Sequence, residues 1–83
     1  MKGETTMKLV SSVYRYFSRS TLPSNIPPIG DIYMIVDYEK PIDSGNGKKM
    51  YGYIDYNSEI PKEKAEKFGL EYATLNPIPV QSK

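Results

Sequence analysis

The groups that could take part in chemistry are mainly carboxylates, tyrosines and basic side chains, because the sequence of 83 residues contains no histidine and no cysteine. Without these two residue types, neither a Ser-His-Asp triad nor a Cys-His pair can be built. Zinc, haem and iron–sulfur clusters also lose their ordinary ligands. Carboxylates could hold Mg²⁺ or Ca²⁺, but the turn that follows Asp43 lacks the alternating oxygen ligands of a calcium loop. We therefore expect no metal site, no cofactor and no nucleophilic catalysis.

Two aspartates are the best candidates for a pair of catalytic carboxylates. Asp37 and Asp55 each lie in a segment that alternates like a strand, and a turn separates the two segments. As cross-strand neighbours they could act as the acid and base that cleave a glycosidic bond. Such chemistry needs an enclosed cleft, and a chain of this length offers little depth for one. The sequence therefore predicts that the protein is not an enzyme.

Tyrosine is enriched, with eight residues among 83 and no tryptophan. The pattern predicts Tyr33 near Tyr51 or Tyr53 on one face of a sheet, together with Asp37 and Asp55. Exposed tyrosines anchor protein partners well, because they offer rigid amphipathic area at low entropic cost. These five residues are our candidate binding face. The alternative is structural: the tyrosines pair across strands, or they lie beneath the helix or the first strand.

A second candidate surface consists of four basic residues, Arg15, Arg19, Lys48 and Lys49. If they converge beside the tyrosines, the sheet could stack the bases of single-stranded nucleic acid. The formal net charge is only +1, however, and aspartates on the tyrosine face would repel phosphate. Nucleic-acid binding is therefore the alternative to protein binding and not the first expectation.

A hairpin is the element that must position the tyrosines. Residues 31–38 (DIYMIVDY) and 49–56 (KMYGYIDY) alternate in a way that predicts two strands. The stretch 39–48 between them is dense in turn residues, and Asn46-Gly47 predicts positive φ angles at its tip. Gly52 in the second strand indicates a bulge or the close approach of another segment.

One helix is expected over residues 61–68 (PKEKAEKF). Pro61 suits a helix start, and Gly69 is placed to end the helix in a left-handed conformation. Leu70 would then fold back onto Ala65. Two turns do not persist alone, so the helix must dock on the sheet.

The first element, residues 7–19, is ambiguous. Its Val, Ser, Tyr and Phe content favours a strand, although the apolar residues also fit a helical stripe. Residues 20–30 contain three prolines and cannot be regular, and residues 70–75 predict a last strand. The expected fold is α+β in the order β-β-β-α-β: a small, mostly antiparallel sheet with one short helix packed on it.

A single domain is expected over residues 1–83, with residues 1–6 as a leader and 77–83 as an extended tail. No stretch approaches the roughly 20 apolar residues of a membrane span, and the first residues lack the apolar region of a signal peptide. We therefore expect a cytoplasmic protein that does not enter a membrane.

A short pattern joins the first predicted strand to the proline-rich connection. It has the form Tyr-x-x-x-Ser-Arg-x-x-Leu-Pro-x-x-Ile-Pro and begins at Tyr14. In this pattern and the strand that follows, as far as Asp37, the chain resembles small domains found in proteins of phages and conjugative elements. The resemblance implies an accessory protein of a mobile element. Small stoichiometric inhibitors of host defence systems are similar in character, being short, without catalytic residues, and rich in tyrosine and acid.

The function expected from these observations is binding. We expect a small non-enzymatic module that binds a protein partner through strands 31–38 and 49–56 and the loop between them, with acidic and aromatic side chains entering a basic groove. Two alternatives stay open: a single-stranded nucleic-acid module, and a self-assembling structural protein that forms homo-oligomers.

Overall fold

The computed structural model describes residues 12–43 and 47–80, which form one antiparallel sheet with short helical elements beside it. The predicted α+β fold with a single short helix is confirmed. The predicted leader, residues 1–6, lies outside the described residues, as do 7–11 of the first predicted element. In chain order the elements are β1 (Ser12–Ser18), the 3₁₀ turn η2 (Pro23–Asn25), β2 (Ile32–Asp43), β3 (Lys49–Tyr56), α1 (Lys62–Lys67), β4 (Leu70–Tyr72) and β5 (Ile78–Pro79).

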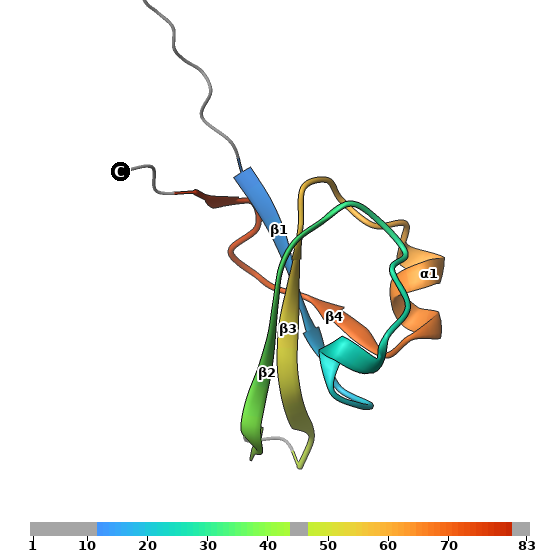
Figure 1. Cartoon of the computed structure of the whole chain (residues 1–83), viewed down its shortest axis with the longest axis vertical. Helices are drawn as coiled ribbons and strands as arrows, with labels where there is room; N and C mark the ends of the chain where they lie inside the picture. The colour runs from blue at the N-terminus through green and yellow to red at the C-terminus, as the bar shows by residue number, and fades with distance from the viewer. Residues whose placement is uncertain (1–11, 44–46, 81–83) are drawn as a thin grey trace, which may run out of the picture.

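β1 lies inside the sheet, whose order is β2-β3-β1-β4 with antiparallel pairings throughout (Figure 1). Tyr16 is opposite Ile54 of β3 on one side and Tyr72 of β4 on the other. The strand β5, which the sequence pattern did not predict, pairs with the beginning of β1. The preference for a strand in the first element is thus confirmed from Ser12 to Ser18. Pairing along both edges suits the β-branched and aromatic residues there.

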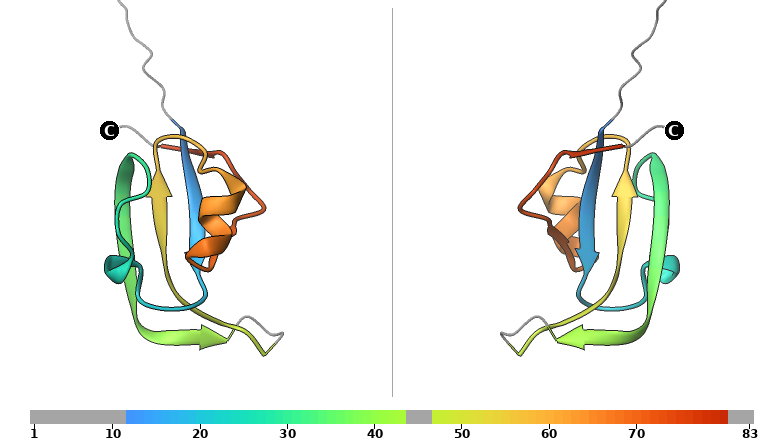
Figure 2. Two further views of the ribbon diagram at one scale, coloured as in Figure 1. Left: turned by 90° about the vertical axis from the view of Figure 1, so that its right-hand side faces the viewer. Right: turned by 90° about the vertical axis from the view of Figure 1, so that its left-hand side faces the viewer.

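The helical elements all lie on one side of the sheet. Figures 1 and 2 show α1 and the connection from β1 to β2, which includes η2, against the same face. On the opposite side, β5 lies against the beginning of β1, where Val13 is only 3% exposed. Among the described residues, no other helix or strand lies over that side. We call this opposite side the outer face; by strand register it carries Arg15, Phe17, Met34, Val36, Tyr38, Tyr53 and Asp55.

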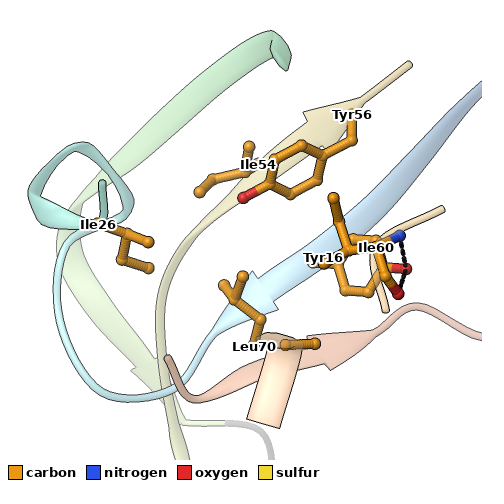
Figure 3. Close-up of a cluster of buried hydrophobic side chains, with 7 residues drawn as sticks. Tyr16, Ile26, Ile54, Tyr56, Ile60 and Leu70 are labelled. Carbon is orange, nitrogen blue, oxygen red and sulfur yellow. Dashed lines mark hydrogen bonds between the residues drawn. The ribbon is translucent and has the colours of Figure 1, made fainter. Parts of the chain in front are cut away.

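The core fills the space between the covered face and the elements packed on it (Figure 3). Tyr16 and Tyr56 meet edge to face with ring centroids 5.6 Å apart. The Tyr16 hydroxyl accepts a hydrogen bond from the Ile60 N–H at 2.9 Å and donates one to the Ile60 carbonyl at 3.3 Å. These bonds tie the residue before α1 to the middle of β1. Ile26, Ile54, Ile60, Ala65 and Leu70 complete the buried cluster.

Both ends of α1 are formed by the residues that the sequence predicts. The Pro61 carbonyl accepts hydrogen bonds from the N–H groups of Lys64 and Ala65, which starts the first turn. Gly69 follows the helix with φ of +68°, a left-handed conformation that glycine adopts without strain. Ala65 and Leu70 then belong to the same buried cluster, so α1 docks on the sheet as expected.

At Gly52 two other segments of the chain approach the β3 backbone closely. The sequence predicted either this or a bulge at Gly52. Its φ is +147°. A Cβ at this position would lie 2.1 Å from the Val36 carbonyl oxygen and 2.8 Å from Cγ of Pro23. Both the β2 backbone and the turn η2 therefore pack against a site that only glycine can occupy.

Strand β2 differs from the prediction in length and register. It continues to Asp43, whereas a loop was expected from residue 39. The ladder is irregular between Asp37 and Ile42, where β2 bends (Figure 2). Pro41 is tolerated because β2 is an edge strand and Pro41 lies in the irregular part of the ladder between Asp37 and Ile42. Gly47 has the expected positive φ, +74°, and Asn46 lies outside the described residues.

The last predicted strand and the tail also differ in detail. β4 ends at Tyr72 and not at residue 75. Beyond it, the Ala73 N–H and the Asn76 side chain hydrogen-bond to the Arg15 backbone, and β5 then pairs with the beginning of β1. The predicted tail 77–83 is extended and paired at Ile78–Pro79, and residues 81–83 lie outside the described part of the chain.

Tyr56 makes the stability of the fold sensitive to alkaline pH. Burial raises the pKa of this phenol from 10.0 to about 12. The folded state therefore holds the proton more tightly than the unfolded state, and this stabilisation is present below pH 10 and is lost as pH rises toward 12. We expect the wild-type protein to lose on the order of 2 kcal/mol of unfolding free energy over this range, measured by urea denaturation. Tyr56→Phe should lose less.

The Tyr56→Phe variant should be no less stable than the wild type at pH 7, because the Tyr56 hydroxyl is buried without a hydrogen-bond partner among the described residues. Tyr33→Phe, at an exposed tyrosine, is the control and should follow the wild-type pH profile. Identical alkaline slopes for all three proteins would contradict the assignment to Tyr56.

Candidate binding site on the outer face

The centre of the outer face is an ion pair between directly opposed residues of β1 and β3. Arg15 Nε lies 2.8 Å from Asp55 Oδ1, and Arg15 Nη2 lies 2.9 Å from Asp55 Oδ2, so the pair is bidentate. Asp55 is only 2% exposed and the Arg15 side chain 28% exposed. The hydrogen bonds to Asp55 raise the pKa of Arg15 above its ordinary value. The two charges therefore neutralise one another at the surface of the sheet.

One aromatic ring contacts this ion pair, and two more rings pack against that one. The Arg15 guanidinium carbon lies 3.9 Å from the centroid of the Tyr53 ring, which is a cation–π contact. Phe17 and Tyr38 meet Tyr53 edge to face, at centroid distances of 6.0 Å and 6.2 Å. We call Arg15, Phe17, Tyr38, Tyr53 and Asp55 the outer-face cluster. Because its members hold one another in place, it loses little side-chain entropy when something binds to it.

The apolar rim of this cluster comes from β2. Met34 is opposite Asp55 and Val36 is opposite Tyr53, so both project on the outer face. Met34 is 43% exposed. An apolar and aromatic surface with its charges already paired suits contact with another protein.

The structure brings together only part of the predicted tyrosine and acid face. Tyr53 and Asp55 lie side by side on the outer face, as expected. Asp37 does not, because it is opposite Gly52 and accepts hydrogen bonds from Ser24 N at 3.0 Å and Ser24 Oγ at 2.6 Å, on the side covered by η2. The predicted pairing of the two aspartates is wrong.

Tyr33 is also not where the pattern placed it. A register shift between Ile32 and Met34 puts Ile32 opposite Tyr56 and Met34 opposite Asp55. Tyr33 therefore lies at a bulge, near the end of the hairpin farthest from Tyr51, and not beside Tyr51 or Tyr53. The shift also puts Ile32 on the opposite face from Met34 and Val36.

The four basic residues do not converge into one patch. Arg19, Lys48 and Lys49, together with Tyr51, line an open groove of about 760 Å³ where the hairpin bends toward the end of β1. Arg19 is ion-paired with Glu71, which also lines the groove. Arg15 does not line this groove and is ion-paired with Asp55. The groove therefore mixes both signs of charge.

Sequence reasoning missed Phe17, Tyr38 and the rim residues as members of the site. Alternation in the first strand does place Val13, Arg15 and Phe17 on one face, and this was the available signal. It could not be used, because nothing in the pattern shows which strand lies next to β3.

Known proteins and other features of the chain give no independent indication of function. No protein-family model, no curated protein and no solved structure matches the chain. Within residues 12–43 and 47–80, no group of three or more acidic residues is arranged to hold a metal ion. None of the helices in that part of the chain is long and apolar enough to cross a membrane.

The Arg15–Asp55 pair should be energetically coupled. Asp55→Asn leaves the guanidinium without its counter-ion, and we expect a loss of about 2–3 kcal/mol, somewhat below the cost at a fully buried pair because Arg15 is partly exposed. Arg15→Met should cost a similar amount, because it leaves a buried carboxylate unpaired. The double variant should cost at least about 1 kcal/mol less than the sum of the two. Urea denaturation measures all four proteins, and additive losses would contradict the pairing.

Proposed function

We propose that this protein is a non-enzymatic module that binds a protein partner in a stoichiometric complex through the outer face of its sheet. The observation that carries the proposal is the outer-face cluster: three aromatic rings and an arginine, in contact with one another on the part of the outer face that β5 does not cover. Tyrosine and arginine are the residues that most often dominate binding energy at protein interfaces.

The charge arrangement favours a protein over nucleic acid. Binding to nucleic acid depends on cations that are available to phosphate. On the outer face Arg15 is committed to Asp55, and at the end of β1 Arg19 is committed to Glu71. The sequence placed both Asp37 and Asp55 on the tyrosine face, where they would repel phosphate, and the structure places only Asp55 there. The ion pairs of Arg15 and Arg19 nevertheless favour a protein partner over nucleic acid. The partner therefore meets an apolar and aromatic surface and not an acidic one.

The separation of the two candidate carboxylates supports a non-enzymatic role. Asp55 lies on the outer face in an ion pair, and Asp37 lies on the other side of the sheet bound to Ser24. The two groups cannot act on one glycosidic bond, because that chemistry needs both carboxylates to flank it.

An accessory protein of a mobile element, such as an inhibitor of a host defence system, is the concrete form that we propose for this module. It is supported by the resemblance of the segment beginning at Tyr14. The residues of that pattern have structural roles here: Ser18 donates to the Thr21 carbonyl, Pro23 packs on Gly52, and Ile26 lies in the core. In this chain the pattern therefore describes how the connection is built.

Substitutions on the outer face should abolish partner capture. Met34→Lys places a charge beside Tyr53 and Asp55, and Tyr38→Ala removes one ring of the cluster. We expect each to weaken capture of the partner from host lysate by at least about tenfold, or 1.4 kcal/mol. The measurement is an affinity pull-down with the tagged chain, treated with nuclease at low and high salt, followed by titration of the recovered protein.

The matched control is Leu22→Lys, because Leu22 is an apolar residue of similar exposure, 38%, in the connection on the covered side. It should bind like the wild type. Equal binding by all variants would remove the outer face from the proposal. Recovery that disappears with nuclease would instead support nucleic-acid binding, and a mass that grows with concentration in light scattering would support self-assembly.

A further inference from the structure

A small pocket lies on the other side of the molecule, between α1 and β4. Its volume is about 310 Å³, at the small end of the range of roughly 300–1,000 Å³ that is typical of ligand sites. Ile60, Ala65 and Leu70 form its apolar wall, and all three belong to the buried core. The pocket is therefore backed by the most tightly held part of the fold.

The rest of the lining combines aromatic rings with carboxylates. Tyr16 and Tyr72 lie on the sheet side, with ring centroids 5.2 Å apart. The Tyr16 hydroxyl is already bonded to Ile60, whereas Tyr72 is 43% exposed and its ring surface is available. Glu59 and Glu66 are exposed carboxylates on the helix side. Burial and the nearby Glu59 carboxylate raise the pKa of the Tyr72 phenol.

The outer face shows what this combination of groups binds. There, a tyrosine ring beside an aspartate holds the Arg15 guanidinium by stacking and by a bidentate ion pair. The pocket beside α1 also offers a tyrosine next to carboxylates. No arginine of the described residues lines this pocket, and neither Glu59 nor Glu66 is ion-paired within that part of the chain. Among the described residues that line it, Lys62 is the only basic one, one helical turn before Glu66.

We propose that this pocket receives an arginine side chain of a protein partner. The aliphatic stem of the arginine would lie along Ile60, Ala65 and Leu70, and its guanidinium would stack on Tyr72 and pair with Glu59 or Glu66. A planar guanidinium suits the site better than a lysine ammonium, because it can stack and form two parallel hydrogen bonds at once. The site is separate from the outer face, so this inference goes beyond the function proposed above and does not rest on it.

The test is an NMR titration of the full isotopically labelled chain with N-acetyl-arginine N-methylamide. Saturable shifts are expected at the methyl groups of Ala65 and Leu70 and at the Tyr72 ring. The citrulline analogue, which has the same shape without the charge, should bind at least about tenfold more weakly. The lysine analogue should also bind more weakly than arginine.

Three variants locate the site. Glu59→Gln and Glu66→Gln remove one carboxylate each and should weaken binding several-fold. Glu63→Gln, on the same helix but outside the pocket, should leave it unchanged. Equal binding of arginine and citrulline, shifts confined to Tyr53 and its neighbours, or no saturable shift at all would overturn the proposal.

The Met34→Lys variant separates this inference from the proposed function. It should lose partner capture but keep the arginine titration at Ala65 and Leu70. Loss of both in that variant, with the fold intact by circular dichroism, would show that the pocket does not act as a separate site.

Discussion

The helical elements cover one face of the sheet, and the other face is covered only by β5 at the beginning of β1 within the described part of the chain. The short helix, the turn η2 and the connection around it are all placed on one side, where they close a core around Tyr16, Ile54 and Tyr56. On the other side, a buried carboxylate would be costly without a partner. The Arg15–Asp55 pair removes that cost, and Tyr53, Phe17 and Tyr38 shield it.

β1 connects these two sides because its residues alternate between them. Tyr16 reaches into the core and fastens the start of α1 through Ile60, whereas Arg15 and Phe17 belong to the outer-face cluster. A small domain has limited buried area with which to stabilise itself. We propose that a partner binds the accessible aromatic part of the outer face.

Local patterns predicted the elements but not the register between them. The alternation of residues 31–38 and 49–56, the prolines of the connection and the Gly69 cap led to the observed fold class and helix. The bulge at Tyr33 could not be foreseen, and a shift of one residue changes which side of the sheet each later side chain occupies. This is why Asp37 and Tyr33 were assigned to the binding face, and why Met34 and Val36 were not. Arg15 was treated as a free cation because its partner is 40 residues away in the chain.

The central claim is that the outer face is open in the isolated protein. NMR with a soluble paramagnetic probe measures this directly, because protons that solvent can reach relax faster. The account predicts strong relaxation at the Met34 methyl group and intermediate relaxation at the rings of Tyr38 and Tyr53, with little effect at Ile54 and Leu70, at every protein concentration. Outer-face protons as protected as those of Ile54 would mean that another part of the chain or a second copy covers this face, and would contradict the account.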